Sequence, residues 1–114
     1  MAVEIGRYRT ASGDEPFSQW LLDLRDPQAR ILVRLERLAL GNFGDVKVVR
    51  DGVSELRIDW GPGYRVYFGR DGKSSIVLLC GGDKRKQDAD VEKAVALWRE
   101  YANRERRREP RSKA

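Results

Sequence analysis

Three stretches rich in β-branched and aromatic residues follow one another in the second half of the chain, separated only by turn residues. Asp71 and Gly72, between the second and third stretches, are a strong signal for a tight hairpin turn, and a Gly-Pro-Gly sequence joins the first two. Connections this short allow only antiparallel pairing, because parallel strands need a long crossover. The sequence therefore predicts an antiparallel sheet built from residues 53–60, 64–68 and 75–80.

The remaining chain contributes two shorter strands and three helices. Residues 3–8 alternate apolar and polar side chains, and residues 46–49 are rich in valine. A first helix starts either at Ser12, which has capping-box spacing to Glu15, or at Glu15 followed by Pro16. Asp26 and Pro27 predict the start of a second helix, and helical spacing of apolar residues predicts a third over residues 87–104.

Together these elements predict an α+β fold. We expect a small, mainly antiparallel sheet that carries an N-terminal helical hairpin and a C-terminal helix. The tryptophans Trp20, Trp60 and Trp98 all fall on apolar faces, and we expect them in the core.

The length and charge of the chain indicate one domain with a basic end. A chain of 114 residues has the usual size of a single domain, which we place at residues 1–103. Residues 104–114 hold six basic and two acidic residues, which leaves 17 basic and 16 acidic residues in the rest of the chain. The net charge of +5 is therefore mostly a property of this end, which we expect to be disordered.

Composition excludes several classes of chemistry. The sequence has no histidine, the commonest proton shuttle and metal ligand, and no metal-ligand spacing or nucleotide-binding fingerprint, so we expect no metal and no cofactor. Cys80 is the single cysteine and lies in an apolar run, as expected of a core residue. No apolar run is long enough to span a membrane and no signal peptide is apparent, so we expect a cytoplasmic protein that does not act at membranes.

The hairpin through residues 61–63 segregates polar from apolar side chains. With a three-residue loop, Trp60 would face Tyr64 and Ile58 would face Val66, forming an apolar side toward the helices.

The other side of this hairpin gathers Glu55, Arg57, Asp59, Arg65 and Tyr67. One interpretation is a solvated lattice of cross-strand ion pairs. The other is a phosphate-binding surface, in which guanidinium groups grip phosphate oxygens and the tyrosine ring stacks on a base.

A second basic cluster follows the last predicted strand. Gly81 and Gly82 precede Lys84, Arg85 and Lys86, directly before the C-terminal helix. Glycines allow a ligand to approach the backbone, and a helix start favours anions, so this segment is either an anion site or a solvated turn.

Four segments, in this order, resemble the HigB-like branch of the RelE/ParE superfamily of toxins, a phage-derived addiction-module killer family. The Glu-Leu-Arg and Gly-Tyr-Arg-Val-Tyr elements are specific in combination, and the resemblance covers about residues 3–103. The segments are Gly44-Asp45-Val46-Lys47, Gly52-Val53-Ser54-Glu55-Leu56-Arg57, Gly63-Tyr64-Arg65-Val66-Tyr67-Phe68, and residues 79–87 with Asp90 beyond them.

The resemblance implies a type II toxin that cleaves mRNA, usually on the ribosome, by metal-independent attack of the 2′-hydroxyl. It also implies a cognate helix-turn-helix antitoxin that neutralises the toxin and through which alone the pair contacts operator DNA. Two alternatives stay open: a non-enzymatic DNA gyrase inhibitor similar to ParE, and an inactive module that only binds an antitoxin.

The resemblance also implies roles for particular residues. Arg57, Arg65, Lys84 and Lys86 match the catalytic positions, with the two arginines as the phosphate clamp. Some relatives use a histidine or a C-terminal tyrosine in catalysis, whereas this chain has no histidine and carries Tyr101 on an apolar helix face. The general acid and base therefore stay open, with the lysines and Glu55 as candidates. The residues expected to bind RNA are Lys47, Arg50, Tyr67 and Arg85.

Overall fold

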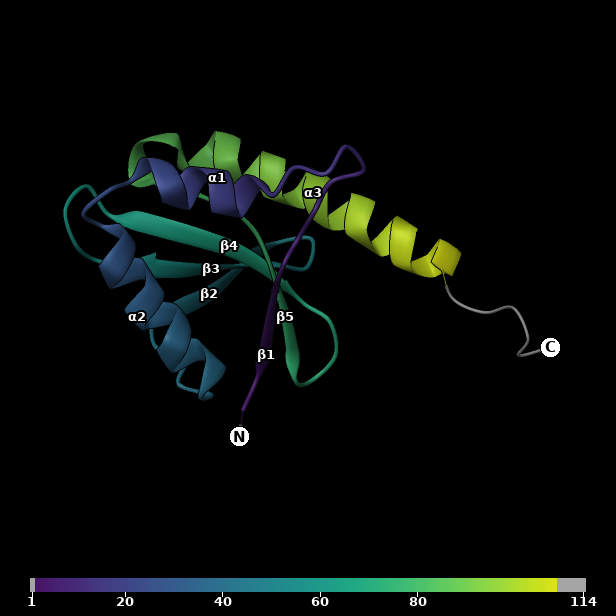
Figure 1. Cartoon of the computed structure of the whole chain (residues 1–114), viewed down its shortest axis with the longest axis horizontal. Coiled ribbons are helices and arrows are strands. Elements are labelled where there is room, and N and C mark those ends of the chain that lie inside the picture. Colours follow the sequence, from purple (N-terminus) through teal and green to yellow (C-terminus); the bar gives the residue numbers. More distant parts are fainter. Residues whose placement is uncertain (1, 109–114) are drawn as a thin grey trace.

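The fold is a five-stranded sheet between two layers of helices, seen in a computed structural model that describes residues 2–108 (Figure 1). The strand order is β1-β5-β4-β3-β2, and every pairing is antiparallel except β1 with β5. The predicted α+β class is confirmed. The strands are β1 (Glu4–Arg7), β2 (Val46–Arg50), β3 (Val53–Ile58), β4 (Tyr64–Arg70) and β5 (Ser75–Asp83). The helices are α1 (Pro16–Asp23), α2 (Gln28–Ala39), the single 3-10 turn η1 (Lys84–Lys86) and α3 (Gln87–Arg108).

The central hairpin forms as predicted, but in a different register. Ile58 lies opposite Tyr64, and Arg57 lies opposite Arg65, so the expected pairing of Ile58 with Val66 is wrong by two residues. The loop spans residues 59–63 because backbone hydrogen bonds from Trp60 to Ile58 and from Gly63 to Trp60 turn the chain before Tyr64. A shift of two residues preserves which side chains share a face, so the predicted segregation of the hairpin survives.

The first strand of the chain joins the sheet by pairing with the last strand. β1 runs parallel to β5, with Ile5 opposite Ile76. No local pattern predicts this pairing, because the partners are separated by two helices and three strands.

The starts of α1 and α2 follow the proline signals. Glu15 caps α1 and Pro16 is its first residue, as one of the two expected starts had it. Pro27 rather than Asp26 occupies the cap position of α2, and the helix begins at Gln28. Only a short turn separates the two helices, and α2 turns away from α1 at an open angle over the sheet (Figure 1).

Each face of the sheet has its own core. On one face, α1 and α2 pack against β3, β4 and β5 through Phe17, Leu35, Leu56, Val66 and other buried apolar residues. On the opposite face, α3 packs through Ala94 and Val95 against a second cluster; its strand residues include Val53, Tyr67, Leu79 and Cys80.

The C-terminal helix is longer than the sequence predicted. α3 continues through Arg108, so residues 104–108 are helical and the expected disordered end cannot begin at Arg104; residues 109–114 lie outside the described part. Among residues 2–108, no helix combines the length and the hydrophobicity needed to cross a bilayer.

Two of the three tryptophans lie as expected. Trp20 packs against Gly81 and Trp98 against Gly69, where any side chain would collide with the indole. Trp60, however, is 37% exposed, so its assignment to the core is wrong.

Candidate functional site: a cationic pocket at the end of the sheet

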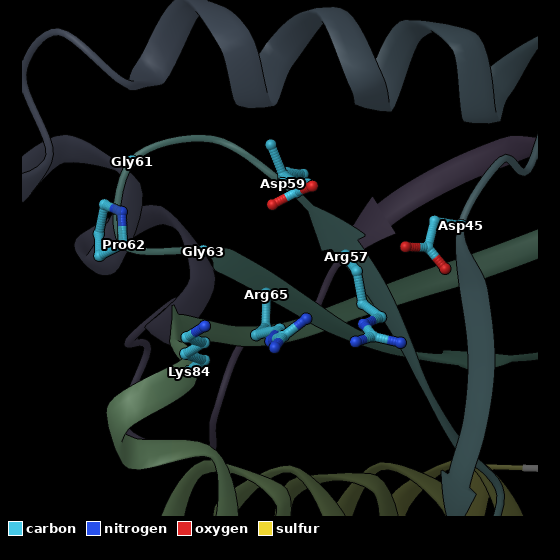
Figure 2. Close-up of a pocket in the computed structure, with 9 residues that line it drawn as sticks. Asp45, Arg57, Asp59, Gly61, Pro62, Gly63, Arg65 and Lys84 are labelled. Atoms are coloured by element: carbon cyan, nitrogen blue, oxygen red, sulfur yellow. The ribbon is translucent and has the colours of Figure 1, made fainter.

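A pocket of about 230 Å³ opens where β3 and β4 meet the loop between them. Figure 2 shows Arg57, Arg65 and Lys84 at this pocket, with the carboxylates of Asp45 and Asp59 beside them. The three cations come from β3, β4 and the turn η1, so only the folded chain brings them together. The pocket is also lined by Ile58 and by the loop residues Gly61, Pro62 and Gly63.

The loop fixes the position of Lys84. Gly63 has φ +82°, a left-handed conformation that favours glycine. Its carbonyl accepts a hydrogen bond of 3.0 Å from the backbone N–H of Lys84, and the lysine stem passes close to the Gly63 Cα. Asp83 holds the following turn, because its carboxylate accepts from the backbone N–H of Arg85 at 2.9 Å. These contacts attach the start of η1 to the rim of the pocket.

The two arginines are cross-strand neighbours, and their charges are poorly compensated. Like charges directly opposite one another on a sheet repel. The closest described carboxylate is that of Glu55, whose Oε1 lies 3.9 Å from Arg57 Nε. Arg65 is 8% exposed, and its buried Nε has no hydrogen-bond partner among the described residues. An unsatisfied buried donor of this kind costs free energy.

Glu55 does not line the pocket but contacts Arg57, which does. Its side chain is 1% exposed, and it accepts a 2.8 Å hydrogen bond from Gln87 Nε2 at the start of α3. A carboxylate enclosed in this way is poorly placed to take a proton from a ligand in the pocket. Its contacts orient Arg57 and join β3 to α3.

Tyr67 lies in the α3-side core and is fully buried. Burial, with the Glu55 carboxylate nearby, raises the pKa of its hydroxyl well above the ordinary value. The expected use of its ring as a stacking surface for a base is therefore wrong for this residue. The periodicity placed it on the correct face, but could not show that α3 covers that part of the face.

The other predicted cations lie outside the pocket. Lys86 and Arg85 line a separate surface hollow on the far side of Lys84, and Arg85 forms a 3.0 Å ion pair with Asp83. Lys47 lies on β2, where it is exposed and pairs with Glu55 of β3. Arg50 lies farther along β2, beside Asp51. Of the four expected catalytic residues, the structure thus brings three together and leaves Lys86 apart.

The glycine pair before η1 makes room for side chains, not for a ligand. A side chain at Gly81 would collide with Trp20, and one at Gly82 would collide with Asp90. Burial raises the pKa of Asp90, and its Oδ2 has no hydrogen-bond partner in the described part of the chain.

Sequence reasoning missed the carboxylates of the pocket. The pattern placed Asp59 only among the members of a possible ion-pair lattice, and nothing singled out Asp45. Asp45 lies inside one of the four segments that carry the resemblance, and its carbonyl accepts a 2.9 Å hydrogen bond from the N–H of Arg57. That segment was the available signal. Within residues 2–108, histidine, cysteine, aspartate and glutamate side chains form no group of three or more suited to a metal ion.

Comparison with known proteins shows that most of the chain, including the residues of the pocket, matches a known family. Residues 19–99 match the sequence model of a family described as phage-derived protein Gp49-like. An uncharacterized protein of Haemophilus influenzae is 49% identical over 86 residues, which make up 74% of this chain and 87% of that protein. Every residue that lines the pocket falls within the span matched by the family.

Proposed function

The chain belongs to the family of phage-derived Gp49-like proteins, and from this premise we propose that it is the toxin of a type II toxin–antitoxin pair that cleaves mRNA. The family is related to toxin–antitoxin systems. The four sequence segments that resemble HigB-like toxins of the RelE/ParE superfamily support the finer assignment.

One observation carries the proposal: Arg57, Arg65 and Lys84 converge on a single pocket, and Arg65 forms no ion pair with a described residue. Guanidinium groups match the oxygens of a phosphodiester with two parallel hydrogen bonds. A pocket with three cations is also suited to the additional negative charge that develops on phosphorus during cleavage.

The reaction that fits these groups is intramolecular. The ribose 2′-oxygen attacks the adjacent phosphorus and loses its proton, while the bond from phosphorus to the 5′-oxygen breaks. The products are a 2′,3′-cyclic phosphate and a 5′-hydroxyl. Arg57 and Arg65 hold the phosphate in line for attack, and Lys84 stabilises or protonates the departing 5′-oxygen.

The base is one of the two carboxylates that line the pocket, Asp45 and Asp59. Separate Asp45→Asn and Asp59→Asn variants test which of the two is the base. The variant that lacks the base loses cleavage, whereas the other keeps most of it; unchanged cleavage in both variants would assign the proton transfer to Lys84 or to water.

The proposed partners follow from this activity. The substrate is mRNA, engaged on the ribosome in the cytoplasm, and a helix-turn-helix antitoxin restrains the toxin and carries the pair to operator DNA. Lys47 and Arg50 on β2, with Arg85 and Lys86 beyond the pocket, are exposed and add weaker contacts to the RNA backbone.

The experiment that tests the function maps mRNA ends in bacteria after brief induction of the protein. Wild-type protein is expected to arrest growth and to create discrete new 5′ ends within coding regions. Arg57→Ala and Arg65→Ala should abolish both effects, while Lys73→Ala, at the other end of the sheet, should not. Growth arrest without new ends, accompanied by a DNA-damage response, would instead indicate gyrase inhibition.

A further inference from the structure

A second hollow lies on the other side of the Ile58–Asp59 segment from the pocket. It has a volume of about 540 Å³ and runs along α2. Ile58 and Asp59 line both hollows, so the two adjoin and share this segment as a common wall. In Figure 2, Asp59 lies between the cations of the pocket and the blue helix above them, which is α2. The groove is lined by Ala29, Arg30, Val33, Arg34, Arg37, Ile58, Asp59 and Trp60.

Three arginines form a stripe along this groove. Arg30, Arg34 and Arg37 are spaced four and three residues apart, which places them on one side of α2. Like charges at this spacing repel one another, and none of the three forms an ion pair with a described residue. Asp59 is the only carboxylate in the lining. The stripe is therefore an uncompensated row of guanidinium groups, suited to a polyanion.

The exposed tryptophan belongs to the same groove. The guanidinium carbon of Arg30 lies 4.3 Å from the centre of the Trp60 ring, and the ring is 37% exposed. Tyr64 lies nearly parallel to the same ring, with centroids 6.3 Å apart, so Arg30, Trp60 and Tyr64 form a stack whose exposed part can contact a nucleobase.

Arg34 connects the groove to the pocket. Its Nη1 donates a 3.2 Å hydrogen bond to the backbone carbonyl of Arg57, and Arg57 is one of the residues that line the pocket. A strand held in the groove would therefore lie against the segment that positions the phosphate clamp.

We propose that the Arg30–Arg34–Arg37 groove binds single-stranded RNA next to the cleaved bond. Its arginines contact backbone phosphates, and Trp60 stacks on a base. The inference rests on the proposed function, since the groove would hold the strand whose phosphodiester sits in the pocket where that strand passes Asp59. An acidic protein segment is the other possible occupant. RNA is favoured because the groove adjoins the proposed phosphate-binding pocket, with which it shares Ile58 and Asp59.

The test uses the full chain and a labelled RNA of about 12 nucleotides whose 2′-hydroxyls are methylated, so that it binds but cannot be cleaved. Affinity is measured by fluorescence anisotropy over a range of salt concentrations. The groove variant carries Arg30→Gln and Arg37→Gln, which spares the backbone contact of Arg34. The control variant carries Arg99→Gln and Arg106→Gln on α3, removes the same charge, and lies outside both hollows. Circular dichroism verifies that each variant is folded.

The groove variant should bind about tenfold more weakly than wild type, and its plot of log affinity against log salt should be shallower by about 1.4, as expected for two lost phosphate contacts. Trp60→Leu should weaken binding with no change of slope. The control variant should lose much less affinity.

Equal losses in the groove and control variants would overturn the inference. Unchanged RNA binding by the groove variant would also overturn it. If that variant had lost binding to an oligoglutamate peptide, the groove would be assigned to an acidic protein. In both cases, loss of RNA binding by Arg57→Ala would leave the proposed function standing. Failure of wild-type protein to bind the RNA at all would also overturn the inference, whereas the proposed function is decided separately by the mapping of mRNA ends.

Discussion

The two faces of the sheet differ in how they bury charge. The face under α1 and α2 is an apolar core in which Leu56 and Val66 are fully buried. The face under α3 mixes apolar residues with Glu55 and Arg65, both of which are removed from solvent. Buried charges cost free energy, so their presence on one face only indicates that this face is organised for a ligand as well as for stability. Substitutions on the two faces should separate these two roles.

The largest effect is expected on activity from the α3 face. Arg57→Ala and Arg65→Ala each remove a donor that holds the phosphate, and each should lower the rate of mRNA cleavage by about 10²–10³. Rates are measured from the decay of a reporter mRNA in a translation extract. A loss below about tenfold in both variants would exclude these residues as the phosphate clamp.

The neighbouring residue on the other face should show the reverse behaviour. Leu56→Ala leaves a cavity among α1, α2 and the sheet, and should lower the free energy of unfolding by about 2–5 kcal/mol. Cleavage per folded molecule should stay close to wild type. Urea unfolding gives the stability, and a large loss of specific activity in the folded variant would show that the two faces are not separable.

Glu55→Gln tests the contact that couples charge and packing. The change retains the volume of the side chain but weakens the bond from Gln87 and removes the anion beside Arg57. We expect a loss of about 1–3 kcal/mol in the free energy of unfolding, together with slower cleavage. The exposed Glu92→Gln is the matched control. If cleavage disappeared completely while stability was unchanged, Glu55 would be a proton-transfer group after all.

The smallest effect concerns pH and Asp90. Because burial raises its pKa in the folded protein, ionisation of Asp90 disfavours folding at neutral pH. This cost is absent below the ordinary carboxyl pKa, appears as pH rises, and is complete above the raised value. Asp90→Asn should therefore be slightly more stable than wild type at neutral pH, with the difference vanishing in acid. Thermal melts across pH measure it, with the exposed Asp88→Asn as control; a variant less stable at neutral pH would contradict this assignment.

The fold was predictable because its signals are local. The turn at Asp71 and Gly72 and the proline at the start of α1 each fixed a connection, and alternation of polar and apolar residues fixed the faces of β3 and β4. The register of the hairpin was not predictable, because the hydrogen bonds from Trp60 to Ile58 and from Gly63 to Trp60 lengthened the loop. The parallel pairing of β1 with β5 was also missed, since nothing in either segment specifies so distant a partner.

The site was predictable in part. Strand periodicity placed Arg57 and Arg65 on one polar face, and the resemblance to HigB-like toxins assigned them, with Lys84 after β5, to the site. Which cations reach the pocket depends on the path of η1, and this separates Lys84 from Lys86. The burial of Tyr67 and the exposure of Trp60 depend on how helices cover the sheet, which single-strand patterns do not specify.

The chemistry of the new RNA ends tests the central claim most directly. RNA isolated after brief induction is ligated with an adaptor specific for 5′-hydroxyl ends, in parallel with one specific for 5′-phosphates. Attack by the 2′-hydroxyl predicts that wild-type protein produces 5′-hydroxyl ends within coding regions, and that the Arg57→Ala/Arg65→Ala double variant produces none. New ends that carry 5′-phosphates, or ends that persist in the double variant, would contradict the assignment of this pocket as the site of cleavage.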